Sequence, residues 1–232
     1  MKLGVVLPIF EDRVDAALHA ASLAARAGLD GVFAYDHLWP MGRPDRPALA
    51  PFPILAAVAV AHPTLVVGPL VARVGLVDDA VLLAQFRSLE GLAPGRVIAA
   101  LGTGDALSRA ENEAYGLPYG SAEERRASLA SCAAALQEEG IETWVGGGSP
   151  ATMTLARALG ATINCFSATP ERVAEVAEGG PVSWAGTAAK SPEALAEQLH
   201  ALSSAGATWA VCSYPIEAEA LARAAETLAP PG

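Results

Sequence analysis

The first feature with chemical meaning is the sequence VGGGSP at residues 145–150, where three glycines lead into a serine and a proline. Ser149 followed by Pro150 is typical of a helix start, because serine caps the first turn and proline needs no N–H donor there. Glycines let backbone N–H groups approach an anion, and a helix N-terminus favours negative charge. Gly147, Gly148 and Ser149 are therefore candidate phosphate ligands. The alternative is that the glycines only form a tight turn.

A second candidate site is the pair Asp36-His37, which follows a short apolar run. Histidine acts as a general acid or base near neutral pH, and a neighbouring carboxylate can orient its ring. The alternative is a loop cap or a surface residue, and the residues alone leave both open. The three other histidines fall in segments with helical spacing, where structural roles are expected.

A weaker glycine loop is LGTGD at residues 101–105, which contains Thr103 and Gly104. The same argument for an anion applies, but no helix is expected directly after it. A polar loop is expected to continue to Gly120. The loop at 145–150 is therefore the preferred anion site.

Several other chemistries are disfavoured by what the sequence lacks. It contains no serine-hydrolase elbow, Walker loop or H-E-x-x-H motif, and its three cysteines have no metal-binding spacing. No metal site is therefore expected. Schiff-base chemistry would need Lys190, which follows a strand-like run and is one of only two lysines.

The charge and hydropathy of the chain limit its partners. The formal net charge of −10 disfavours nucleic acid and anionic membranes, because both bind clustered lysine and arginine. No apolar run reaches membrane-spanning length, and the N-terminus lacks the pattern of a signal peptide. We expect a cytoplasmic protein that acts on a small molecule.

These candidate residues must be positioned by an alternation of short apolar runs and amphipathic segments. Eight cycles can be counted, with strand-like runs at residues 3–7, 31–36, 64–71, 96–102, 143–147, 161–166, 181–186 and 208–214. Strands separated by helices pair in parallel, and runs apolar on both faces are buried on both sides. The sequence predicts an α/β fold, a compact (β/α)₈ TIM barrel in a single domain over 1–232. A doubly wound open sheet is the alternative.

The helix starts and the tryptophans agree with this arrangement. Ser121 and Glu124 form a capping box, and a serine or threonine precedes proline at Ser149, Thr169 and Ser191. Trp144, Trp184 and Trp209 lie within strand-like runs and are expected in the core. In such a barrel the active site lies at the carboxyl ends of the strands, where the candidate residues above are found.

The order of motifs resembles the luciferase-like monooxygenases, a family that includes oxidoreductases dependent on coenzyme F420. The likeness rests on AGLDGVFAYDHL, on LLAQFRSLEGLAPGRVIAALGTGD and on WVGGGSPATMTLARALGATIN. It implies a barrel that binds FMN or coenzyme F420 and transfers a hydride to or from a small organic substrate. It implies His37 as the proton donor or substrate-orienting group, beside Asp36. The cofactor-binding residues that it implies are Val71, Ala72, Thr103, Gly104, Gly147, Gly148 and Ser149.

The chain is shorter than typical members of that family. Gly140 runs almost directly into Trp144, and Gly179-Gly180 passes straight into the next strand. The resemblance implies that family insertions which help to cover the cofactor are missing here. Two alternatives to an oxidoreductase or monooxygenase stay open: a non-catalytic flavin-binding protein on the same barrel, and another phosphate-ligand barrel enzyme such as an isomerase or aldolase.

Two further features bear on the cofactor tail and on self-association. The tail of coenzyme F420 would favour exposed basic groups, and the candidates are Arg43, Arg46, Arg73 and Lys190. The apolar segment 52–61 could pair with a copy of itself, so a homodimer is expected.

Overall fold

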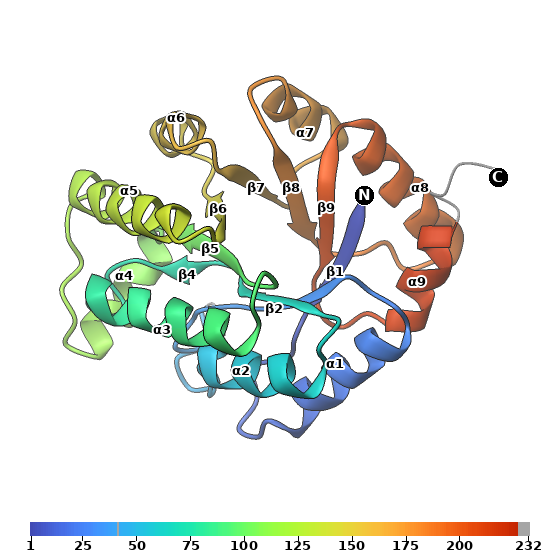
Figure 1. The fold of residues 1–232 in the computed structure, drawn as a ribbon, viewed down its shortest axis with the longest axis horizontal. Coiled ribbons are helices and arrows are strands. Elements are labelled where there is room, and N and C mark those ends of the chain that lie inside the picture. The colour runs from blue at the N-terminus through green and yellow to red at the C-terminus, as the bar shows by residue number, and fades with distance from the viewer. Residues whose placement is uncertain (41, 227–232) are drawn as a thin grey trace.

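The computed structural model describes residues 1–40 and 42–226, in which parallel strands form a barrel that helices surround (Figure 1). The strands are β1 (Lys2–Val6), β2 (Gly31–Ala34), β3 (Val66–Pro69), β4 (Ala72–Arg73), β5 (Ile98–Gly102), β6 (Glu142–Gly146), β7 (Thr162–Phe166), β8 (Val182–Gly186) and β9 (Ala207–Cys212). The helices are α1 (Asp15–Arg26), α2 (Pro51–Ala61), α3 (Asp79–Leu92), α4 (Ala106–Ala114), α5 (Ala122–Glu138), α6 (Pro150–Ala158), α7 (Pro170–Ala177), α8 (Pro192–Ser204) and α9 (Ala218–Glu226).

The sheet closes on itself. Its order is β3-β2-β1-β9-β8-β7-β6-β5-β4, and the two flanks meet through a parallel bridge between Val67 and Val97. The Val67 N–H donates to the Arg96 carbonyl at 2.9 Å. Gly68 permits this approach, because a Cβ there would overlap the carbonyl oxygen of Ile98. The predicted (β/α)₈ barrel is confirmed, and the open doubly wound sheet is wrong.

The third predicted strand is where the elements differ from expectation. The run at 64–71 is divided into β3, which pairs with β2, and β4, which pairs with β5. A cis peptide bond joins Leu70 to Val71 between them. Eight predicted runs therefore give nine strands, because one run contributes two.

The inside of the barrel is filled by aromatic side chains. Phe33 stacks on Trp144 with ring centroids 5.4 Å apart, and Trp209 packs edge-on against both. Trp184 is also buried, in the layer between strands and helices. The prediction that these three tryptophans lie in the core is confirmed. Trp144 and Trp209 pack with Phe33 inside the barrel, and Trp184 packs outside it against the helices.

The helix starts follow the predicted capping pattern. Ser121 caps α5 in a capping box with Glu124, and the side chains of Ser149, Thr169 and Ser191 cap α6, α7 and α8 ahead of proline. One expectation is wrong: the segment expected to be a polar loop up to Gly120 contains helix α4. Each capped helix returns the chain to the bottom of the barrel for the next strand.

The two short connections noted in the sequence are short in the structure as well. Residues 139–141 join α5 to β6, and residues 178–181 join α7 to β8. Both connections precede a strand, so they lie at the end of the barrel opposite to the carboxyl ends of the strands. The loss of cover over the cofactor that the resemblance implies stays a prediction.

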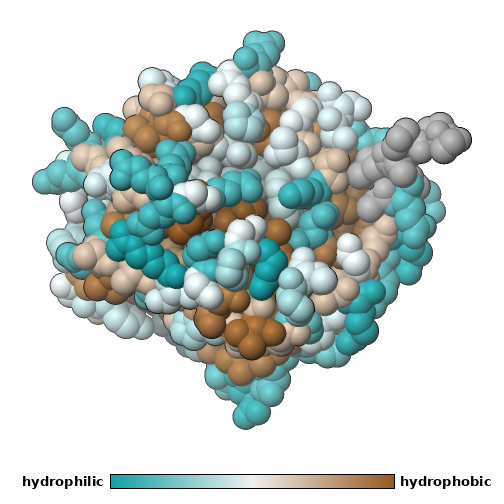
Figure 2. Space-filling view, viewed as in Figure 1, coloured by the Kyte–Doolittle hydropathy of each residue, from teal (hydrophilic) through white to brown (hydrophobic). Residues whose placement is uncertain are grey.

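The surface is mostly polar on the face drawn in Figure 2, with apolar residues gathered over α2 at its lower edge. Within α2, Pro53, Ala57 and Val60 are exposed, and Val60 keeps 65% of its accessible area. Among the described residues, no helix is long and apolar enough to cross a membrane.

Candidate functional site

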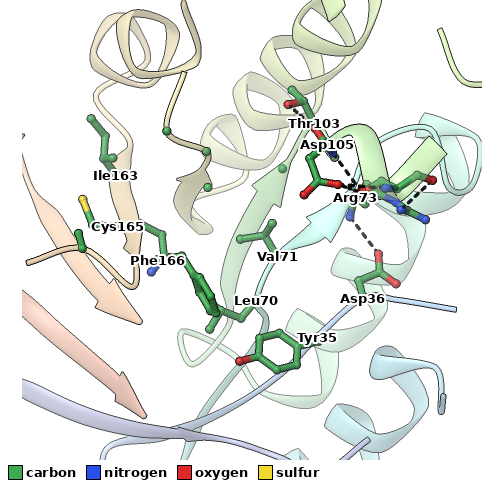
Figure 3. Close-up of a pocket in the computed structure, with 18 of the residues that line it drawn as sticks. Tyr35, Asp36, Leu70, Val71, Arg73, Thr103, Asp105, Ile163, Cys165 and Phe166 are labelled. Carbon is green, nitrogen blue, oxygen red and sulfur yellow. Dashed lines mark hydrogen bonds between the residues drawn. The ribbon is translucent and has the colours of Figure 1, made fainter. Parts of the chain in front are cut away.

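A cavity of about 750 Å³ opens at the carboxyl ends of the strands. One side, which we call the α4 wall, is formed by Asp36, His37, Arg73 and Asp105. The opposite side, the β7 wall, is formed by Ile163, Cys165 and Phe166. Figure 3 shows the two sides facing each other, with Leu70 and Val71 between them. The cavity therefore has a charged wall and an apolar wall.

The α4 wall is organised by Glu111, a buried carboxylate on α4 with 1% of its side chain exposed. Its Oε1 lies 2.8 Å from Nδ1 of His37, and its Oε2 accepts the Leu38 N–H at 2.9 Å. The same Oε2 accepts from the Arg73 guanidinium at 3.2 Å. A buried charge is costly unless paired, so Arg73 and Glu111 depend on each other.

The electrostatics of Glu111 follow from these contacts. Burial by itself would raise its pKa, but the hydrogen bonds from His37 and Leu38 and the charge of Arg73 outweigh burial. The pKa of Glu111 is therefore lowered, and the carboxylate stays ionised at neutral pH. An ionised Glu111 can only accept hydrogen bonds, so it fixes Nδ1 of His37 as a donor.

Asp36 lies on the same wall but in a different electrostatic situation. Its Oδ2 accepts the backbone N–H of Arg73 at 2.9 Å, which ties the end of β2 to β4. Burial raises the pKa of Asp36, and this effect exceeds the lowering by Arg73. The pKa of Asp36 is thus raised by burial, while the pKa of Glu111 on the same wall is lowered by pairing.

His37 is the member of this network that faces the cavity. Its side chain is 27% exposed and lines the opening. Its Nδ1 is held by Glu111, while no described residue hydrogen-bonds its Nε2. The geometry leaves Nε2 as the atom that can exchange a proton with a bound molecule.

Helix α4 brings Glu111 to this position. Asp105 caps the helix by accepting from the N–H groups of Leu107 and Ser108 at 2.9 and 3.0 Å. Partial burial would raise the pKa of Asp105, but these hydrogen bonds hold it below its ordinary value. The helix buries Ser108, Glu111 and Asn112, so its inner face is polar.

The floor between the walls is apolar and is shaped by glycine. Val71 lies over the ends of β5 and β6, where a Cβ at Gly102 would overlap its side chain and a Cβ at Gly146 would lie 2.9 Å from it. On the β7 wall, burial raises the pKa of the Cys165 thiol, which disfavours the reactive thiolate. This half of the cavity offers a smooth surface for a flat ring.

The predicted anion loop lies at the rim next to the β7 wall. Gly147 and Gly148 line the cavity, and a side chain added at Gly148 would meet open space. The Ser149 hydroxyl accepts the Thr152 N–H at 3.2 Å and caps α6. Arg172, from the first turn of α7, also lines the cavity, and its Nη2 lies 3.4 Å from the Met153 sulfur on α6.

Most of the predicted site residues are brought together, with two exceptions. The lining includes Asp36, His37, Val71, Thr103, Gly104, Gly147 and Gly148. Ala72 is fully buried beside the floor, and Ser149 stands behind the glycines as a helix cap, so neither lines the cavity.

Two candidate residues were missed by the sequence reasoning. Glu111 lay in the supposed loop, although Asp105 and Ser108 at capping-box spacing signal a helix there. Arg172 follows Thr169-Pro170, and any basic residue in the first turn of such a helix falls near the mouth of the barrel.

The basic groups expected at the mouth are distributed differently from the prediction. Arg73 is buried and bound to Glu111, so it is not an exposed anchor. Arg43 pairs with Asp45 at 3.1 Å on the surface. The Arg46 guanidinium donates to the Phe10 carbonyl at 3.1 Å. Lys190 is exposed and is not part of the cavity lining.

Comparison with known sequences gives a consistent match. The luciferase-like monooxygenase family matches residues 1–138. F420-dependent glucose-6-phosphate dehydrogenase from Beutenbergia cavernae is 35% identical over 116 residues, which are 50% of this chain and 34% of that protein. F420-dependent hydroxymycolic acid dehydrogenase from Mycobacterium tuberculosis is 32% identical over 116 residues, which are 49% of this chain and 32% of that protein. The matched segment spans about a third of each relative.

Solved structures share the barrel. An F420-dependent secondary alcohol dehydrogenase in complex with an F420-acetone adduct superposes with a TM-score of 0.82 at 14% identity, covering 99% of both chains. The coenzyme F420 dependent tetrahydromethanopterin reductase from Methanopyrus kandleri gives a TM-score of 0.76 at 13% identity, covering 96% of this chain and 97% of that one. At these identities the likeness concerns the fold alone. The family match, which extends over more than half of the sequence, establishes that this chain belongs to the luciferase-like monooxygenases.

Proposed function

We propose that the protein is an oxidoreductase that binds coenzyme F420 or FMN in the cavity and transfers a hydride to or from a small organic substrate. The observation that carries this proposal is the pairing of an apolar floor with a glycine loop at a helix N-terminus. The F420 dependence of the matched relatives favours that cofactor over FMN.

The residues present fit such a cofactor. Val71, seated on Gly102 and Gly146, gives a flat surface on which a tricyclic ring can lie. The free space at Gly148, beside the N-terminus of α6, suits a phosphate group. Arg172 adds a positive charge at the same rim, although it also pairs with Glu175 at 2.8 Å.

The α4 wall would exchange a proton with the substrate. Glu111 orients the His37 ring by accepting from Nδ1, so that Nε2 can give or take a proton at the substrate. Asp36 holds the backbone of Arg73 and shapes the opening next to His37. The bound cofactor supplies the hydride chemistry, and the protein supplies orientation and the proton.

Cofactor binding can be tested by titrating the purified protein with coenzyme F420 and with FMN, following cofactor fluorescence and calorimetry. Gly148→Trp should fill the space at the rim and weaken binding by at least about tenfold, which corresponds to about 1.4 kcal/mol. Gly91→Trp is the matched control, because Gly91 on α3 also has open space around its Cα and lies outside the cavity.

The outcomes separate the proposed function from its rivals. If neither cofactor binds the wild-type protein, the proposal is wrong. If a cofactor binds but no hydride is exchanged with a panel of alcohols and carbonyl compounds, the protein is a non-catalytic cofactor-binding barrel. The isomerase or aldolase alternative has no structural support through Lys190, which is exposed outside the lining of the cavity.

We also infer that two copies associate through α2. Pro53, Ala57 and Val60 form an exposed apolar strip on this helix. Val60→Glu should reduce the sedimentation coefficient from that of a dimer to that of a monomer. Sedimentation of the wild-type protein as a monomer would contradict this inference. One domain and a cytoplasmic location stay predictions from the sequence.

A further inference from the structure

Three aromatic side chains line the cavity that the proposed function assigns to a cofactor and substrate: Phe10, Tyr35 and Phe166. Phe10 and Tyr35 stack with centroids 5.9 Å apart and an interplanar angle of 17°. The Phe166 ring meets Tyr35 edge-on at 6.4 Å. We call these three residues the aromatic cluster, and Figure 3 shows Tyr35 and Phe166 close together at the foot of the β7 wall.

The aromatic cluster bridges strands that are not neighbours. Phe10 follows β1, Tyr35 follows β2, and Phe166 ends β7, while β8 and β9 lie between them in the barrel. Those two intervening strands lead into small residues, Gly186 and Ser213. Phe166 therefore reaches Tyr35 across the carboxyl ends of β8 and β9.

Phe166 is largely exposed although it ends a buried strand. The phenyl group keeps 57% of its accessible area exposed, although it belongs to a strand whose other residues are buried. Ser167, the next residue, has a φ of 53°, in the left-handed region that a serine rarely adopts. Backbone conformations of this kind concentrate at ligand sites, where the strain serves to place a neighbouring group.

Tyr35 is held more firmly than Phe166. Its hydroxyl lies 2.9 Å from the Ser213 hydroxyl, and burial raises the pKa of the phenol. The phenol therefore stays neutral at physiological pH. Phe10 extends the cluster toward the proton-exchanging group, because its ring centroid lies 6.5 Å from that of His37. The open face of the cluster is thus apolar, neutral and next to His37.

The charges around this face disfavour an anion. Asp36 and Asp105 line the cavity on the side of His37. The positive charge of Arg73 is already paired with Glu111 at 3.2 Å. The remaining lining cation, Arg172, contacts α6 at the rim where the glycine loop lies. A phosphate on the substrate would therefore meet carboxylates and aromatic rings instead of a free positive charge.

We propose that the aromatic cluster is the substrate subsite and that it takes a neutral, planar aromatic compound bearing an alcohol or carbonyl group, and not a sugar phosphate. The inference rests on the proposed function and specifies its substrate class. The ligand ring packs on the exposed face of Phe166, and its oxygen lies toward His37. Burial of aromatic surface provides the affinity, and ring-to-ring geometry provides the orientation.

The experiment uses three probes that separate ring from charge: 1-naphthol, 1-naphthyl phosphate and glucose 6-phosphate. Each is titrated calorimetrically into the protein loaded with whichever cofactor it binds. We expect 1-naphthol to bind at least tenfold more tightly than 1-naphthyl phosphate and glucose 6-phosphate not to bind. Equal or tighter binding of either phosphate would overturn the proposal.

Variants then assign the binding to the cluster. Phe166→Ala should weaken 1-naphthol binding by about tenfold and leave the Kd of the cofactor unchanged, since packing on one aromatic ring accounts for a difference of that size. Tyr115→Ala, which removes another exposed aromatic ring outside the cavity lining, should leave 1-naphthol binding unchanged. A loss of cofactor affinity in Phe166→Ala, with naphthol binding unchanged, would assign the cluster to the cofactor and refute the proposal.

The two proposals can fail independently. If the protein binds neither cofactor, the proposed function fails, and the naphthol titration is then performed on the unloaded protein. Retention of 1-naphthol binding that depends on Phe166 would preserve the aromatic subsite without the oxidoreductase. Cofactor binding together with no affinity for 1-naphthol would preserve the oxidoreductase and reject the subsite.

Discussion

The two walls of the cavity are held in place by different physical means. The α4 wall depends on Glu111, whose carboxylate joins His37, Leu38 and Arg73 through hydrogen bonds and an ion pair. The β7 wall has few polar contacts and presents Ile163, Cys165 and Phe166 to the opening. The difference indicates that the α4 wall fixes a proton-handling group in one orientation, while the β7 wall provides apolar surface that a ligand can cover.

The largest effect is expected from removing the carboxylate of the α4 wall. Glu111→Leu leaves the Arg73 guanidinium buried without its ion partner, so the free energy of unfolding should fall by about 3 kcal/mol. Urea denaturation followed by circular dichroism measures this change. Glu113→Leu on the same helix is the control, because that side chain is 63% exposed. A loss below about 1 kcal/mol would mean that water already reaches Arg73 and that the wall is not organised by the pair.

A smaller effect is expected at the floor where the two walls meet. Gly102→Ala places a methyl group against Val71, and overpacking of this kind costs about 1–3 kcal/mol. The double variant Gly102→Ala/Val71→Ala should recover most of that loss, as measured by the same denaturation experiment. Simple additivity of the two single changes would show that the methyl group and Val71 do not compete for space.

Two carboxyl groups of the α4 wall should respond to pH in opposite ways. The folded pKa of Glu111 lies below its ordinary value of 4.5, so its stabilising contribution is complete above that pH and is lost as pH falls through the folded pKa. Asp36, whose pKa is raised by burial, acts in the opposite direction.

The stability of the wild type and of Glu111→Gln should therefore converge as the pH is lowered below 4.5. Glu113→Gln serves as the control and should keep the wild-type profile. A constant difference between wild type and Glu111→Gln at every acidic pH would contradict the role of the ionised carboxylate.

The smallest effect on stability is expected at the β7 wall. Phe166→Ala should change the free energy of unfolding by less than about 0.5 kcal/mol, because the ring is exposed in the unliganded fold. Phe86→Ala, at a fully buried phenylalanine, should cost about 3–5 kcal/mol in the same assay. A large loss in Phe166→Ala would show that the ring supports the barrel and is not reserved for a ligand.

The barrel was predictable from the sequence because its signals are local and repeated. Strand-like runs alternate with helices whose starts are marked by pairs such as Ser149-Pro150 and Ser191-Pro192. Asp36-His37 and the 145–150 loop were also found, since residues that follow parallel strands meet at one end of a barrel. Helix α4 was missed because its buried face consists of Ser108, Glu111 and Asn112, and periodicity was sought only in apolar residues.

The contacts across the cavity could not be predicted in the same way. The ion pair of Arg73 with Glu111 joins residues 38 positions apart on separate elements. The contact of Tyr35 with Phe166 depends on the closure of the barrel, because it joins residues at the ends of β2 and β7. Such pairings follow from the curvature of the whole sheet, which no local pattern reports.

The aromatic rings inside the barrel also give the protein an intrinsic spectroscopic probe. Trp144 and Trp209 touch each other and Phe33 directly beneath the cavity, with their ring centroids 5.8 Å apart. Indole rings at this separation couple their electronic transitions, so near-ultraviolet circular dichroism should display a split band that vanishes on unfolding. A coloured ligand in the cavity above these rings would accept excitation energy from the same tryptophan pair. Tryptophan emission would therefore report occupancy of the cavity without any attached label.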